Sequence, residues 1–177
     1  MSDFNEYTIF MVGTAGLSKA LTLIEKNTEM LEKRYSKRYL NESIYRLIKR
    51  KKEALDLVGS FEKKEIYRKI KYIVPCEEDG VFGALWQLGE ELKMGLKVNL
   101  QDIPIDQSVI EICDYMDINP YETDSSGAYV MASETPGFIA CELKKMDLSL
   151  KLIGYTDTGK ARIVYGSTNR YLTKRTD

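Results

Sequence analysis

The chain has 177 residues, of which 44% are hydrophobic and 30% are charged, and its 26 Lys and Arg nearly balance its 27 Asp and Glu. This length favours one domain that folds without disulfides, and the apolar fraction excludes a disordered chain. The sequence contains no histidine, which excludes His-based catalytic triads, His-containing zinc sites and imidazole general bases.

Apolar periodicity, capping residues and turn residues predict elements along the whole chain. The first half holds a strand over 6–12, a helix capped by Thr14 and running to Leu31, a long helix from Ser36 to Val58 stopped by Gly59, a short helix over 61–70 and a strand over 72–74 ended by Pro75. The second half holds a helix over 81–94 stopped by Gly95, a strand over 96–100, a helix capped by Asp106 and ended by Asn119-Pro120, a strand over 129–132, a helix over 137–147, and strands over 150–155 and 161–165 joined across 157–159. With no linker or internal repeat, this order predicts one α+β domain over 1–177, with a mixed β-sheet and packed helices.

The three cysteines, Cys76, Cys113 and Cys141, are far apart and form no C-x-x-C pair. They are therefore predicted to be reduced thiols that behave as small apolar residues, and no metal site is predicted. The N-terminal segment lacks the apolar core of a signal peptide, and no apolar run reaches the roughly 20 residues of a membrane span. We expect a cytoplasmic protein without a membrane partner.

The charges are unevenly distributed along the chain. Residues 31–71 hold 14 Lys and Arg against 6 Asp and Glu, a net of +8, whereas residues 72–124 hold 2 against 12, a net of −10. The two segments can complement each other within the fold or across a dimer, or the basic one can bind nucleic acid. The bases of 46–71 face away from an apolar helical stripe, and the pI is 5.7, so a solvated helix face is favoured and nucleic acid stays an alternative.

The turn Gly13–Lys19 lies between the first strand and the first helix. The N–H groups at the start of that helix could hold a phosphate near Thr14 and Gly16. The spacing does not match a P-loop, which has four residues between its glycines and then Gly-Lys-Ser/Thr. Taken alone, the residues favour a tight turn.

Several blocks follow one another in a characteristic order: Val81-Phe82-Gly83-Ala84-Leu85-Trp86-Gln87-Leu88, Gly95-Leu96-Lys97-Val98-Asn99-Leu100, Ile103-Pro104-Ile105, Asp117-Ile118-Asn119-Pro120-Tyr121 and Asp124-Ser125-Ser126-Gly127-Ala128-Tyr129. This succession resembles the C-terminal half of the aminoimidazole ribonucleotide (AIR) synthetase-related family. Within that family it is most similar to the hydrogenase maturation (carbamoyl dehydratase) type. The resemblance covers nearly the whole chain, and the basic segment 46–71 matches least.

The resemblance implies a fold like the AIR synthetase C-terminal domain. Together with the N–H groups at the start of the first helix, it gives seven candidate ligand-binding positions: Thr14, Gly16, Gly80, Gly83, Ser125, Ser126 and Gly127. For Ser125–Gly127, the residues themselves favour a Ser-Gly turn with positive φ at Gly127. Trp86 matches the family too, but a lone Trp beside helical leucines is predicted to lie in the core.

Departures from the family pattern shape the functional expectation. Family members have about twice this length, and their N-terminal domain, which binds ATP and magnesium, has no counterpart in this sequence. The family's Asp-x-Thr-x-Gly-Gly turn keeps only Gly80, and Glu77, Glu78 and Asp79 precede it. These carboxylates are predicted to cap the helix and to repel a phosphate. The terminal cysteine that accepts the carbamoyl group is replaced by Lys174–Asp177, so that chemistry is not expected.

The first hypothesis is therefore a catalytically incomplete, stand-alone relative that binds a small ligand or a protein, with no catalytic residue assigned. It would form a homodimer or pair with a separate ATP-binding subunit. Cofactors are expected to be none, with ATP and magnesium entering only through such a subunit. The alternatives are one subunit of a split ATP-dependent enzyme and, from another class, a nucleic-acid-binding protein that uses segment 46–71.

Overall fold

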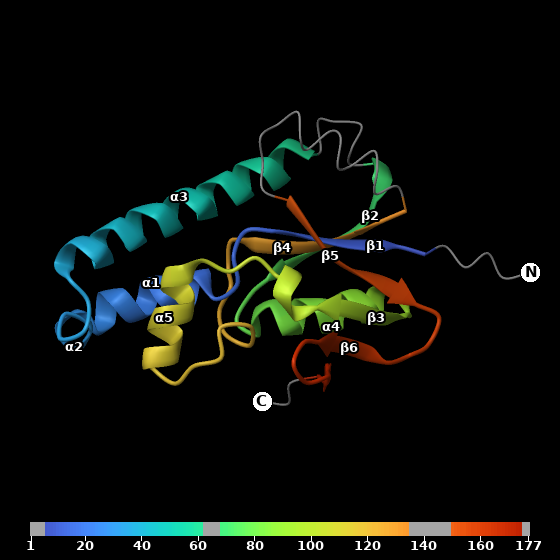
Figure 1. Cartoon of the computed structure of the whole chain (residues 1–177). Coiled ribbons are helices and arrows are strands. Elements are labelled where there is room, and N and C mark those ends of the chain that lie inside the picture. The colour runs from blue at the N-terminus through green and yellow to red at the C-terminus, as the bar shows by residue number, and fades with distance from the viewer. Residues whose placement is uncertain (1–5, 62–67, 135–149, 175–177) are drawn as a thin grey trace, which may run out of the picture.

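The computed structural model describes residues 6–61, 68–134 and 150–174, and within them a seven-stranded sheet has the order β2-β4-β1-β5-β3-β6-β7 (Figure 1). Its neighbouring strands are antiparallel except for β3 and β6, which are parallel, so the predicted mixed sheet is confirmed. The strands are β1 (Thr8–Val12), β2 (Ile70–Cys76), β3 (Gly95–Asn99), β4 (Ala128–Ser133), β5 (Leu150–Asp157), β6 (Arg162–Tyr165) and β7 (Arg170–Tyr171).

Helices cover both faces of this sheet. The long helix α3 packs on one face and α4 on the other, while α1 and α5 pack against the N-terminal half of α3 (Figure 1). The helical elements are α1 (Leu17–Lys26), α2 (Thr28–Leu31), α3 (Lys37–Phe61), α4 (Gly80–Leu92), α5 (Gln107–Tyr115) and a 3₁₀ turn, η2 (Leu100–Asp102). Among the described residues, no helix combines the length and apolarity needed to cross a membrane.

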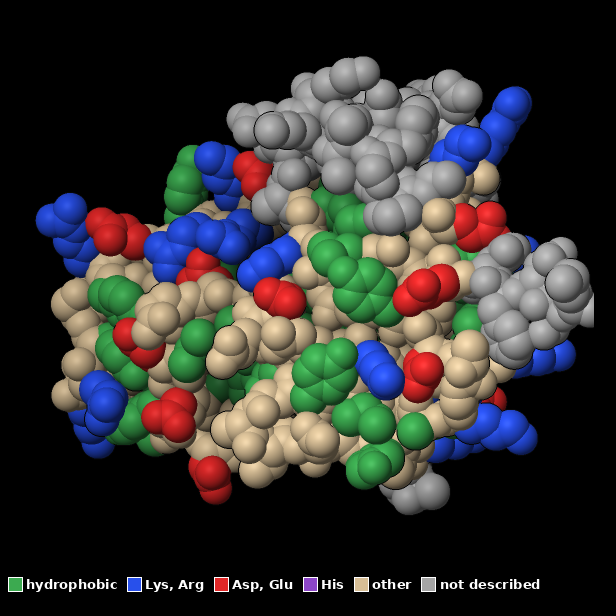
Figure 2. Space-filling view, turned by 45° about the vertical axis from the view of Figure 1, so that its right-hand side comes forward, with side chains coloured by type: hydrophobic (Ala, Val, Ile, Leu, Met, Phe, Trp, Pro, Cys, Tyr) green, Lys and Arg blue, Asp and Glu red, His purple; other side chains and the backbone are tan. Residues whose placement is uncertain are grey.

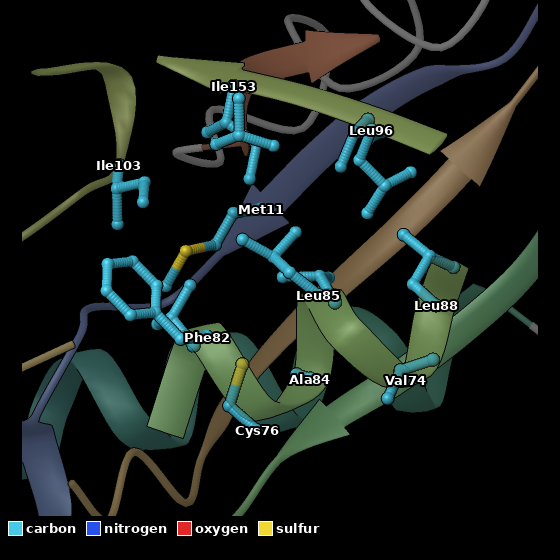
Figure 3. Packing of buried hydrophobic residues seen from close by; sticks show 14 of the residues in the cluster. Met11, Val74, Cys76, Phe82, Ala84, Leu85, Leu88, Leu96, Ile103 and Ile153 are labelled. Carbon is cyan, nitrogen blue, oxygen red and sulfur yellow. The ribbon is translucent and has the colours of Figure 1, made fainter. Parts of the chain in front are cut away.

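The central strand β1 shows why the sheet is covered on both sides. All five of its residues are buried, and successive side chains of a strand point to opposite faces. Ile9 and Met11 join the core under α4, whereas Phe10 and Val12 join the core under α3. Figure 3 shows Phe82 and Leu85 of α4 directed toward Met11 of β1. Each such buried side chain stabilises the fold by about 1.5–3 kcal/mol.

Several predicted helix boundaries differ from the observed ones. Thr14 does not cap α1: the residue before that helix is Gly16, in the left-handed region at φ 66°. Ser36 does cap α3, because its Oγ accepts the Tyr39 N–H at 3.1 Å. That helix continues through Gly59 to Phe61, since the buried Leu57 and Phe61 pack on the sheet and outweigh the low helix propensity of one glycine.

Pro75 does not end its strand, because β2 continues to Cys76. The order of strands places β2 at an edge of the sheet, where a missing N–H is tolerated. Helix α4 stops at Lys93, which adopts a left-handed φ of 54°, and Gly95 already begins β3. Asp106 caps α5 as predicted, but the helix ends at Tyr115, before Asn119-Pro120.

Strands β5 and β6 follow each other along the chain but are not neighbours in the sheet. Strand β3 lies between them and pairs with both, antiparallel to β5 and parallel to β6. The short strand β7 was not predicted, because two exposed residues give no periodicity. The helix expected over 137–147 lies outside the described residues, and so does most of the helix expected over 61–70.

Candidate functional site

The turn between β1 and α1 packs closely against other segments of the chain and does not form an open ligand site. A Cβ on Gly13, at φ 91°, would lie 2.8 Å from the Cα of Ala128. The Gly16 N–H donates to Ser125 Oγ at 2.8 Å, and the Lys19 N–H donates to the Asp124 carbonyl at 3.0 Å. These N–H groups at the start of α1 are therefore already bonded within the chain.

Thr14 has a role that its sequence position did not reveal. Its side chain is fully buried, and its Oγ1 accepts the Asp106 N–H at 2.8 Å. The hydroxyl thus fixes the residue that caps α5, 92 positions away, instead of capping its own helix.

The Ser125–Gly127 turn completes this junction. Ser125 Oγ donates to the Thr123 carbonyl at 2.9 Å while it accepts from Gly16. Gly127 has the predicted positive φ, 96°, and a Cβ there would lie 2.6 Å from Lys51 Cγ. Four of the seven candidate positions, namely Thr14, Gly16, Ser125 and Gly127, therefore contact segments that are distant in the sequence.

Gly80 lies where α4 meets the 121–125 loop. Its φ is 68°, and a Cβ would lie 2.5 Å from the Tyr121 carbonyl oxygen and 2.6 Å from that of Thr123. The Phe82 N–H donates to the same Tyr121 carbonyl at 3.0 Å. The close approach of two backbones accounts for this glycine without a ligand.

The three remaining candidates, Gly80, Gly83 and Ser126, border one hollow, which we call the acidic cavity. It has a volume of about 450 Å³ and is lined by Pro75, Glu77, Glu78, Asp79, Gly80, Gly83, Ala84, Gln87 and Ser126. Asp79 occupies the N-cap position as predicted, but its carboxylate makes no capping hydrogen bond to the described first turn of α4. The three carboxylates give this cavity a field that disfavours anions.

A second hollow, the aromatic pocket, adjoins the first and shares Asp79, Gly83 and Gln87 with it. Its volume is about 290 Å³, and its other lining residues are Phe82, Trp86, Glu122, Arg170, Tyr171, Leu172, Thr173 and Lys174. The rings of Phe82 and Tyr121 stack with centroids 5.6 Å apart and an interplanar angle of 13°. The Arg170 guanidinium lies 5.3 Å from the Phe82 centroid and forms an ion pair with Glu122.

The prediction that Trp86 belongs to the core is wrong. Its side chain is half-buried and lines the aromatic pocket. The Arg162 guanidinium lies 5.4 Å from the indole centroid, and its Nη1 donates to the Trp86 carbonyl at 3.3 Å. Because Arg162 comes from β6, local helical periodicity could not reveal this environment.

The described thiols behave as predicted for small apolar residues. Cys76 and Cys113 are buried and unbonded to each other. Burial raises the pKa of Cys76 above the usual thiol range and that of Cys113 to about 11, so neither carries an activated thiolate near neutral pH. Cys141 lies outside the described residues. In the described ranges, no three Cys, Asp or Glu side chains come together as metal ligands.

The oppositely charged segments do complement each other at one place within the fold. Asp106 is only 4% exposed, and its carboxylate accepts two hydrogen bonds of 2.9 Å from Arg46, with Arg50 Nε at 3.5 Å. Burial would raise its pKa, but the bonds from Arg46 and Ser108 prevail and hold the pKa below the usual range. Figure 2 shows Lys and Arg side chains gathered over α3 with acidic ones among them.

No family model matches the chain, and no curated protein matches it either. Solved structures do. A HypE–HypF complex matches with a TM-score of 0.62 and 17% identity, over 96% of this chain and 53% of that chain. E. coli HypE matches with a TM-score of 0.68 and 14% identity, over 94% and 49% respectively.

Thiamine-monophosphate kinase from Stenotrophomonas maltophilia K279a matches with a TM-score of 0.62 and 14% identity, over 89% of this chain and 49% of that chain. These neighbours belong to the AIR synthetase-related family, in agreement with the resemblance of the motifs. The chain therefore has an α+β fold shared with HypE and thiamine-monophosphate kinase, and it spans about half the length of either.

Proposed function

We propose that the chain is an AIR synthetase-related domain that binds a ligand or another protein and catalyses no reaction on its own. The observation that carries this proposal is the meeting of the acidic cavity and the aromatic pocket beside Gly83 on α4. Two adjoining hollows with different linings are suited to holding a molecule. Nearby, the described thiol Cys76 is buried with a raised pKa, which gives no support to nucleophilic catalysis.

The glycine turns support binding rather than phosphate transfer. These turns were candidates for contacting a ligand. In this structure, however, the Gly16 N–H donates a hydrogen bond to Ser125 Oγ. The cavity beside Gly80 presents Glu77, Glu78 and Asp79, and these carboxylates oppose the approach of a polyphosphate. An ATP-dependent step would need groups that attract the phosphates at this position, whereas these carboxylates repel them.

The test is phosphate release from ATP with magnesium by the purified chain, against a protein-free blank. We expect no release above the blank. Turnover near one per second, within the ordinary range of enzymes, would overturn the proposal. A Glu77→Gln/Glu78→Gln variant tests whether the negative charge of the acidic cavity repels phosphates. It should bind inorganic pyrophosphate several-fold more tightly than the wild type.

A second candidate is one part of an ATP-dependent enzyme whose nucleotide-binding part is a separate chain. It is supported by the fold likeness to E. coli HypE, which covers 94% of this chain and 49% of that chain. A complex purified through a tag on this chain should then hydrolyse ATP. If the tagged chain purifies alone, or its complex is inactive, this candidate fails. A homodimer and a cytoplasmic location remain parts of the proposal.

A further inference from the structure

The aromatic pocket presents two ring side chains from the same side of α4. Phe82 and Trp86 are four residues apart, which places them one turn apart on one helix face. Arg170, Tyr171 and Lys174 come from β7 and the residues after it and complete the lining. A pocket that combines aromatic rings with cationic side chains is suited to a planar aromatic ligand.

Both rings are held in place before any ligand arrives. Phe82 stacks on Tyr121 and lies under the Arg170 guanidinium. Trp86 is backed by Arg162, which also forms an ion pair with Glu90 at 2.6 Å. The Arg162 side chain also packs against α4 at Gly89, where a Cβ would collide with its guanidinium. A ligand would therefore meet rigid rings and would lose little affinity to ordering them.

Charge and size narrow the kind of ligand. The lining contains two acidic residues, Asp79 and Glu122, and two basic ones, Arg170 and Lys174, so its formal charges cancel. The three carboxylates of the adjoining acidic cavity add a field against anions. The volume of about 290 Å³ lies at the lower end of ligand pockets, about 300–1,000 Å³, which suits one or two fused rings.

We propose that the aromatic pocket binds a small, uncharged, planar heteroaromatic molecule that stacks on the half-buried Trp86 beside Phe82. Gln87 lines both hollows and offers an amide, a donor and an acceptor, to the edge of such a ring. The proposal rests on the binding function proposed above and names the class of ligand.

Trp86 is the single tryptophan of the chain, so intrinsic fluorescence reports on this pocket. The probes are nicotinamide, adenine and uracil, with nicotinate as the anionic counterpart of nicotinamide and cyclohexanecarboxamide as a non-planar amide. We expect saturable quenching by at least one of the three neutral rings, with a Kd of about 1 mM or tighter. Nicotinate and cyclohexanecarboxamide should bind at least threefold more weakly than nicotinamide.

Variants test whether the ligand binds in this pocket. Their affinity is measured by calorimetry, with the probe that quenches the fluorescence most strongly. Trp86→Leu should weaken binding by about 5-fold or more, the range for one lost stacking contact. Arg170→Ala, at a half-exposed position, should also weaken binding, and the variant should fold like the wild type. Tyr45→Leu is the matched control, because this aromatic side chain is 73% exposed on α3, and binding should not change.

Three results would overturn the ligand class: no saturable binding of the neutral rings, tighter binding of nicotinate than of nicotinamide, or full affinity in both folded pocket variants. Each of these leaves the proposed binding function standing with another ligand. ATP turnover by the chain alone would instead overturn the proposed function and leave the fluorescence result to be judged separately.

Discussion

The buried carboxylate of Asp106 offers the sharpest test of how the loops are held together. It caps α5 by accepting the Ser108 N–H at 2.9 Å, and it accepts the two bonds from Arg46. Asp106→Ala removes the cap, worth about 1 kcal/mol. It also removes the charge-assisted bonds, worth about 1 kcal/mol once discounted because Arg46 is 41% exposed.

The expected loss in free energy of unfolding is therefore about 2 kcal/mol, or a fall of roughly 4–8 °C in Tm for a chain of this size. Asp106→Asn retains a capping oxygen and should lose about half as much. The control is Arg38→Ala, which breaks an ion pair whose members are 88% and 60% exposed and should cost less than about 0.5 kcal/mol. Urea unfolding followed by circular dichroism measures all three.

The same carboxyl predicts a dependence on pH. Its pKa in the folded state lies below the unfolded value of about 3.9. Its contribution is therefore complete above that value and is lost as the pH falls toward the folded pKa. Between pH 5 and pH 3 the wild type should lose more stability than Asp106→Asn. An Asp106→Ala variant as stable as the wild type, or equal acid sensitivity of the wild type and Asp106→Asn, would refute the reasoning.

Two further predictions concern glycines and thiols. Gly80→Ala should destabilise the chain by about 2–4 kcal/mol, because it combines a left-handed φ with a clash against two carbonyls. Gly59→Ala, inside α3 with open space at its Cβ position, should stabilise it by about 0.5–1 kcal/mol; urea midpoints measure both, and equal shifts would contradict the geometry. Cys76 and Cys113 should react with iodoacetamide only after unfolding, because burial raises both pKa values. Peptide mass spectrometry reads each site, and labelling of either in the folded protein would contradict their burial.

Local signals predicted the features that depend on neighbouring residues. The apolar run of β1, the Ser36 and Asp106 caps and the positive φ of Gly127 all follow from a few consecutive side chains. Thr14 was assigned to the wrong helix because its hydrogen-bond partner is 92 residues away. Short-range reasoning has no access to such a partner.

In the candidate site too, the sequence motifs predicted some features, whereas others depend on contacts between distant segments. The motif residues Gly80, Gly83 and Ser126 do meet at one cavity. The aromatic pocket was missed because Arg170 and Lys174 belong to no motif, and only the sheet brings them to α4. Trp86 looked like a core residue because its helix is largely apolar, and the cation beside it is supplied by β6.

The position of β1 has a consequence for biosynthesis. The strand nearest the start of this sequence lies in the middle of the sheet, and both of its partners, β4 and β5, come much later. At 5–20 residues per second, the about 120 residues between β1 and β4 take on the order of ten seconds to synthesise. During that time a largely apolar strand with both edges unpaired is exposed on the nascent chain. The ribosome-bound chain is therefore a natural client for a chaperone that holds extended apolar segments.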